Sequence, residues 1–192
     1  MRCLFDIALH QTGSNTSAST LPTRVSAGET IQTGENQKAS FLFTDLSVLR
    51  LNQQTTVEIK DMNHLQVKQG LVYVDVNPSN RQQAFLVDTP ATRITVLGTA
   101  FEIQASQTQT TVTVYEGEVI IADAEREEHI RKEETMIVSP TSHTWQKQSK
   151  SHPFPEWVRL LSRQESQNPF IQAMQKLFPS RSIDLYKFQG SQ

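Results

Sequence analysis

The sequence predicts an all-β domain, a rolled or solenoid-like antiparallel β sandwich of short strands, followed by a short α-helical appendage. From Leu21 to about Thr144, apolar residues recur at every second position, which is typical of strands with one face in a core. Glycine and asparagine turn signals divide this span at short intervals, which leaves no room for the crossover helices of parallel strands. After about Ser149 the apolar spacing changes to three and four residues, which indicates helix.

The composition is that of an ordinary globular protein. Of the 192 residues, 36% are hydrophobic and 20% are charged, and the net charge is -2. Disorder throughout is therefore excluded, and the length allows one domain with appendages or two small domains. Since phosphate-binding proteins need clustered basic residues and the sequence has no Lys/Arg stripe, we expect no nucleic-acid partner.

We expect three segments along the chain. Residues 1–20 form a flexible N-terminal segment, because Thr12–Thr20 is a polar, small-residue run that buries little apolar surface. Residues 21–149 form the β domain, and residues 150–192 form a helical tail. No run approaches the roughly 18 apolar residues of a membrane helix, and Asp6 interrupts the short apolar N-terminal stretch, so we expect no membrane segment and no signal peptide in this chain.

The strands are expected where β-branched and aromatic residues alternate with polar ones. Their apolar members are Phe41 and Phe43, Leu49 and Leu51, Val57 and Ile59, Leu65 and Val67, Val72, Val74 and Val76, Phe85 and Val87, Ile94 and Val96, Phe101 and Ile103, Val112 and Val114, and Val119 and Ile121. The first four of these side chains are predicted to be buried. The charged run Glu125–Glu134 is nearly balanced in sign, and we expect it to be a solvated turn between Ile121 and Met136.

The tail is expected to form two short helices. Pro155 suits the first turn of one helix, and the pair Asn168 and Pro169 suits the start of the other, which Pro179 ends. Large apolar side chains on these helices are either a docking face for another protein or a cover for an apolar edge of the β domain. The candidate partner-binding residues are Trp157, Leu161, Phe170 and Leu177.

No pattern of catalytic residues stands out. The histidines lack the spacing of a zinc site, and the sequence has no nucleophile elbow, Walker loop or dinucleotide-binding glycine motif. Carboxylates on the expected strands, such as Glu58 and Glu102, lie between apolar residues and should face solvent. We therefore expect that the protein is not an enzyme, and that it has no catalytic residues, no metal-binding residues and no cofactor.

Two stretches carry a more specific pattern. Val87–Ile103 combines a V-x-T-P strand start with an apolar-x-G-T-x-F strand, and Thr111–Val119 contains V-x-V-x-E-G-x-V. Upstream, Gly28–Gly34 fits G-x-x-I-x-T-G. Together these motifs resemble the FecR domain family over roughly residues 21–138. The fold-defining residues of the motif are Thr89, Pro90, Gly98, Thr99, Phe101, Glu116 and Gly117, and Leu46 stands where the family has the glycine of a D-G-S turn.

This resemblance implies a non-catalytic regulatory or sensor domain of bacterial cell-surface signalling. Such domains lie outside the cytoplasm, typically in the periplasm, and bind other proteins in anti-sigma regulator systems that link a receptor to a sigma factor, as in iron-uptake control. The alternative is a β sandwich that binds a small ligand or a carbohydrate. A concave face with exposed aromatic residues would favour that alternative, but the chain has only two Trp and three Tyr residues.

Overall fold

The computed structural model describes residues 25–43, 45–78 and 83–167, together with Gln172 and Lys176. The chain forms two compact units, Met1–His152 and Pro153–Gln192. The predicted flexible segment, residues 1–20, and the predicted start of the β domain at Leu21 lie outside the described residues. The predicted division at residue 149 stays a prediction.

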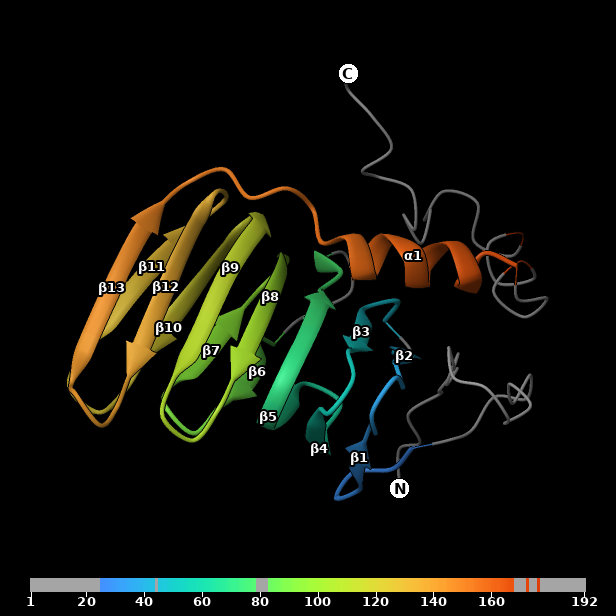
Figure 1. Ribbon diagram of the computed structural model, residues 1–192, viewed down its shortest axis with the longest axis horizontal. Coiled ribbons are helices and arrows are strands. Elements are labelled where there is room, and N and C mark those ends of the chain that lie inside the picture. Colours follow the sequence, from blue (N-terminus) through green and yellow to red (C-terminus); the bar gives the residue numbers. More distant parts are fainter. Residues whose placement is uncertain (1–24, 44, 79–82, 168–171, 173–175, 177–192) are drawn as a thin grey trace. The chain divides into compact units, whose positions relative to one another are not determined.

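The first unit consists of short strands joined by turns (Figure 1). Their bounds are β1 (Thr30–Gln32), β2 (Ala39–Leu42), β3 (Val48–Leu51), β4 (Thr56–Asp61), β5 (His64–Asp75), β6 (Phe85–Asp88), β7 (Arg93–Val96), β8 (Ala100–Ala105), β9 (Thr110–Glu116), β10 (Glu118–Ala122), β11 (Glu127–Arg131), β12 (Glu134–Ser139) and β13 (Thr144–Ser149). The predicted all-β fold is confirmed.

The strands form one curled sheet with two layers. Layer A has the order β1-β4-β5-β6-β7-β10-β11, and layer B has the order β2-β3-β5-β8-β9-β12-β13. In Figure 1, the layer B strands β8, β9, β12 and β13 lie in front of β6, β7, β10 and β11. The long strand β5 belongs to both layers and joins them.

Gly70 lies where β5 passes from one layer to the other. Residues up to Gln69 pair with β4, and residues from Gly70 onward pair with β8. Gly70 has φ of 102°, and a Cβ at this position would lie 2.4 Å from Thr55 Oγ1. Only glycine fits this conformation and this close approach, so Gly70 permits β5 to change layers.

One strand pairing differs from the antiparallel expectation. β6 runs parallel to the first residues of β5, with His64 opposite Leu86. Every other pairing in the described part of the chain is antiparallel. Parallel neighbours need a long connection, and here the remainder of β5 and the segment before Phe85 supply that connection.

The inner faces of both layers enclose a single core. The four side chains predicted to be buried are indeed buried, with exposed fractions of 5% for Phe41, 3% for Phe43 and 0% for Leu49 and Leu51. Phe43 meets Phe85 edge-on, with ring centroids 5.8 Å apart. Burial of each such side chain contributes about 1.5 to 3 kcal/mol, so this core holds the layers together.

The charged run Glu125–Glu134 is not the turn that the sequence predicts. It contains β11, which pairs with β10 over five residue pairs, and the turns on either side of β11 are short. Ile130 is fully buried, while the rest of β11 is exposed. A strand at the border of a sheet buries few side chains, which explains why the sequence of β11 has no alternation of apolar and polar residues.

The second unit contains α1 (Glu156–Glu165), which confirms the predicted short C-terminal helix. Pro155 precedes its first turn, and Glu156 and Arg159 form an ion pair of 2.7 Å. The predicted second helix, with Phe170 and Leu177, lies outside the described residues, apart from Gln172 and Lys176, which are helical. Within the described part of the chain, no helix has the length and apolar character needed to cross a bilayer.

Candidate interaction surfaces

The motif residues Thr89 and Pro90 lie in the turn between β6 and β7. The Thr89 hydroxyl donates to the Thr92 carbonyl at 2.9 Å and accepts the Thr92 N–H at 3.0 Å. Thr110 on β9 adds a hydrogen bond of 2.9 Å to the same hydroxyl. This network fixes a turn, and it places no reactive group in a cavity.

Two glycines of the motif lie side by side, Gly98 between β7 and β8 and Gly117 between β9 and β10. A Cβ on Gly117, which has φ of 80°, would lie 2.7 Å from the Gly98 carbonyl oxygen, and a Cβ on Gly98 would lie 2.5 Å from Pro78 Cβ. Thr99 donates to the Glu118 carbonyl at 2.7 Å, and Phe101 is fully buried. Glu116, at the end of β9, is exposed. The two glycines, Thr99 and Phe101 therefore serve strand packing and turn geometry.

The ionisable side chains of layer A form paired groups on its outer face. Asp88 accepts a hydrogen bond from Arg93 Nε at 2.7 Å and lies 2.8 Å from His64 Nε2. Burial opposes ionisation of Asp88, but the hydrogen bonds from Arg93 and His64 outweigh it and lower the pKa of the carboxyl. Among the described residues, no cluster of three or more His, Cys, Asp or Glu side chains could hold a metal ion.

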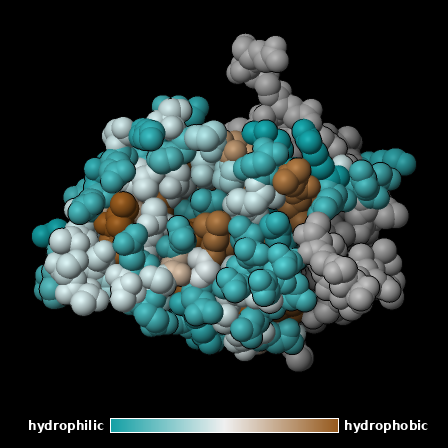
Figure 2. Space-filling view, in the orientation of Figure 1, coloured by the Kyte–Doolittle hydropathy of each residue, from teal (hydrophilic) through white to brown (hydrophobic). Residues whose placement is uncertain are grey.

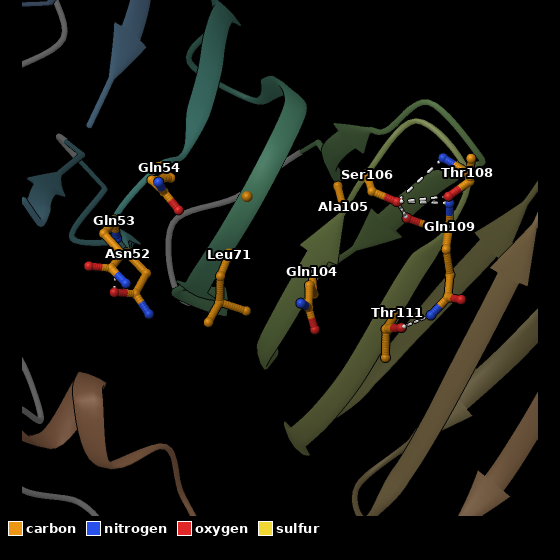
Figure 3. Close-up of a pocket in the computed structure, with 11 residues that line it drawn as sticks. Asn52, Gln53, Gln54, Leu71, Gln104, Ala105, Ser106, Thr108, Gln109 and Thr111 are labelled. Atoms are coloured by element: carbon orange, nitrogen blue, oxygen red, sulfur yellow. Dashed lines mark hydrogen bonds between the residues drawn. The ribbon is translucent and has the colours of Figure 1, made fainter. Parts of the chain in front are cut away.

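A polar groove of about 490 Å³ lies on the first unit. Figure 3 shows side chains of the β3–β4 turn on one side and of the β8–β9 turn on the other, with Leu71 and Gln104 between them. The Gln54 and Gln104 amides have no hydrogen-bond partner within the described residues. The lining residues are Asn52, Gln53, Gln54, Gly70, Leu71, Gln104, Ala105, Ser106, Thr108, Gln109 and Thr111.

The groove gives limited support to the small-ligand alternative. Its volume falls within the range of ligand sites, about 300 to 1,000 Å³, but such sites are mostly apolar and aromatic. None of the lining residues is charged or aromatic. On the face of the first unit that Figure 2 shows, the apolar spots are scattered among polar residues. The polar side chains of the groove are amides and hydroxyls.

The outer border of layer A, at β11, is closed by side chains. Lys132 N–H donates to the Gly117 carbonyl at 3.1 Å, so alternation along the strand directs the backbone groups of His129 and Arg131 away from β10. Lys147 Nζ donates to the His129 carbonyl at 2.9 Å, and Arg131 N–H donates to Glu134 Oε2 at 2.8 Å. An ion pair from layer B therefore binds one outward C=O and one outward N–H of β11.

The two closing side chains also bind each other. Lys147 Nζ lies 3.0 Å from Glu134 Oε2. Desolvation opposes ionisation of Glu134, but the Arg131 N–H and the Lys147 ammonium outweigh it and lower the pKa of the carboxyl. This pair connects β12 and β13 of layer B to β11 of layer A, and it holds the two layers together at this end.

The outer border of layer B, at β13, is open. Lys150 N–H donates to the Glu133 carbonyl at 2.9 Å, so the backbone groups of Trp145, Lys147 and Ser149 point away from β12. No hydrogen bond to these groups occurs within the described residues. Such an edge is a template for another strand.

The sequence analysis did not single out this edge. Trp145 is the single apolar residue of Thr144–Ser149. Hydrophobic periodicity therefore gives almost no signal for a strand here. The candidate tail residues are only partly described. Leu161 is buried and Trp157 is half-buried, while Phe170 and Leu177 lie outside the described residues.

The comparison with protein families adds a finding to this geometry. The model of the family "FecR protein" matches residues 29–120, from just before β1 to the middle of β10. This match confirms the predicted resemblance to the FecR domain family over these residues. The family match covers the turn at Thr89 and both packed glycines, Gly98 and Gly117, so the motif coincides with the landmarks of the fold.

Two solved structures share the fold of this chain. Both are crystal structures of candidate anti-sigma factors from Parabacteroides distasonis ATCC 8503. One, at 2.50 Å resolution, is 22% identical with a TM-score of 0.55, and the match covers 64% of this chain and 60% of that chain. The other, at 1.65 Å resolution, is 16% identical with a TM-score of 0.58, and the match covers 79% and 75%. No curated protein matches the chain.

Proposed function

We propose that this chain is a non-catalytic regulatory or sensor domain that acts by binding another protein in transmembrane or cell-surface signalling, in the manner of an anti-sigma regulator. The observation that carries this proposal is the FecR match over residues 29–120. The fold shared with two candidate anti-sigma factors agrees with it. By the same resemblance, the domain works outside the cytoplasm, in the periplasm.

The described surface suits such a role. The motif residues are used in turns and packing, and the ionisable groups on layer A are paired with each other. Recognition of a protein requires only a complementary surface or an open strand edge, and it needs no titratable group with special reactivity. We propose Trp157, Leu161, Phe170 and Leu177 as contact residues for the partner.

The test is a transcript profile of the source organism with the gene deleted and with the chain overproduced. We expect opposite changes in a small set of promoters that share one sigma factor, since an anti-sigma regulator acts on one sigma factor at a time. Double substitution of Trp157 and Leu161 by Ala should weaken the response, whereas Arg163→Ala, on an exposed part of α1, should not. Unchanged transcripts in both strains would contradict the proposal.

A further inference from the structure

The open edge of β13 has the properties of a strand-pairing interface. The strand pairs with β12 over six consecutive residues without a register shift, and it contains neither proline nor glycine. Proteins usually protect such edges with charged side chains, prolines or bulges. The single charged side chain of β13, Lys147, is directed to Glu134 and to the carbonyl of His129. It therefore protects β11 and leaves β13 open.

We propose that β13 pairs in antiparallel fashion with β13 of a second copy of this chain, so that two copies of layer B form one continuous sheet across a two-fold axis. This homodimer is independent of the proposed signalling role, because it requires only the β domain. A signalling partner is neither assumed nor excluded by it.

The pattern of free backbone groups restricts the pairing. Trp145, Lys147 and Ser149 carry the outward N–H and C=O groups, so an antiparallel copy must pair these residues among themselves. Lys147 opposite Lys147 would bring like charges together, which is unfavourable. Trp145 opposite Trp145 would place the two-fold axis near the start of β13, so most of the strand would have no partner. The remaining central register places Trp145 opposite Lys147 of the second copy.

This register is self-complementary in its side chains. Each indole would lie beside the aliphatic stem of the facing lysine, whose ammonium group stays on Glu134 and the His129 carbonyl. Trp145 is half-buried and packed against the core, which restricts the position of its ring. Gln146 would face Gln146 on the two-fold axis, and Thr144 would face Gln148. All three of these polar side chains are exposed and uncharged.

The first experiment is sedimentation equilibrium of the full chain over a wide concentration range. A short strand edge buries less area than a standard interface, so we expect a reversible monomer–dimer equilibrium with a dissociation constant in the micromolar range or weaker. A chain that stays monomeric up to millimolar concentration overturns the proposal. If the chain stays monomeric and residue 146 cross-links to another protein in cells, β13 pairs with a strand of that protein.

The second experiment tests the register by disulfide formation. In a Cys3→Ser background, which removes the single native cysteine, Gln146→Cys should give a covalent dimer under mild oxidation. Facing residues of a non-hydrogen-bonded pair have Cα atoms about 4.5 Å apart, within the range of a disulfide. Gln148→Cys is the matched control, since it lies on the same face of β13 but opposite Thr144. Equal cross-linking of both variants, or of Gln148→Cys alone, overturns the proposal.

The third experiment removes one outward N–H. Lys147→Pro deletes the donor without touching the bonds to β12, and Lys147→Ala is its control because it removes the same side chain and keeps the N–H. We expect the proline variant to abolish dimerisation and the alanine variant to weaken it. Circular dichroism verifies that each variant is folded, and if the proline variant is unfolded, the Gln146→Cys result decides. Dimers of unchanged affinity in a folded proline variant overturn the proposal.

Discussion

Leu46 has a backbone conformation that residues other than glycine rarely adopt, with φ of 68°. Its turn is fixed by neighbours, since Ser47 donates to both carboxylate oxygens of Asp45 and Asn77 N–H donates to Ser47 Oγ at 2.9 Å. Leu46 occupies the glycine position of the D-G-S turn. The surrounding hydrogen bonds therefore hold a strained residue in place.

Glycine at position 46 should relieve this strain. We expect Leu46→Gly to have a free energy of unfolding about 1 kcal/mol higher than that of Leu46→Ala, because both remove the side chain and only glycine tolerates a positive φ without cost. Urea unfolding of the two variants measures the difference. Equal stabilities would mean that the turn is not strained.

The packed glycines should be intolerant of side chains. We expect Gly98→Val and Gly117→Val each to lower the free energy of unfolding by at least about 2 kcal/mol and to lower the thermal midpoint, because their Cβ atoms would collide with Pro78 and with the Gly98 carbonyl. Gly34→Val is the control, since a Cβ there meets only the flexible Gln37 side chain. Midpoints equal to that of the wild type would refute the structural role of the motif.

At the level of elements, a single ion pair makes the sheet border at β11 different from the border at β13. Lys147 extends from β13, yet its ammonium group binds the His129 carbonyl of β11, so this side chain covers part of one edge and leaves the other free. The turn between β11 and β12 brings Glu134 to the same place. The arrangement explains why the charged residues near this border do not protect β13.

The tail gives a prediction at this level. Truncation after Ser149 removes α1 and the candidate residues Trp157 and Leu161. We expect the truncated chain to keep its β-sheet circular dichroism and to lose binding of the signalling partner. Early melting or aggregation would instead assign the tail to the core of the β domain, and unchanged stability together with unchanged binding would show that the tail has neither role.

For the whole molecule, stability depends on paired carboxylates. Hydrogen bonds from Lys60 and Lys68 lower the pKa of Glu58 from 4.5 to about 2, and hydrogen bonding with His129 lowers the pKa of Glu118. Groups with depressed pKa values stabilise the folded state above the pKa of the unfolded chain, because the unfolded state binds more protons as the pH falls.

Acid should therefore destabilise the protein in a defined window. We expect the free energy of unfolding to be constant near neutral pH and to fall from about pH 4.5 toward pH 2, the interval between the unfolded and folded pKa values of Glu58. Urea titrations at successive pH values measure the slope. Glu58→Gln should reduce the slope, whereas Glu125→Gln, in an exposed turn, should not alter it.

Alkaline pH should destabilise the protein through buried tyrosine. Burial, with the nearby charge of Asp75 as a second cause, raises the pKa of Tyr73 well above 10.0. The folded state keeps this proton while the unfolded chain releases it, so stability is present below about pH 10 and is lost above it. Tyr73→Phe should reduce the loss measured by unfolding at alkaline pH. An equal loss in that variant would remove Tyr73 as its cause.

The local sequence determines the strands and turns of the β domain, because alternation and glycine placement are properties of neighbouring residues. Phe41, Leu49, Gly98 and Gly117 therefore occupy the predicted kinds of position. The tertiary structure alone decides that Gly70 carries β5 between layers, that β6 lies parallel to β5 and that β11 is a strand. It also decides that Lys147 closes one sheet border while the other stays open. These features depend on contacts between residues far apart in the chain, and hydrophobic periodicity contains no information about which strand lies at a border.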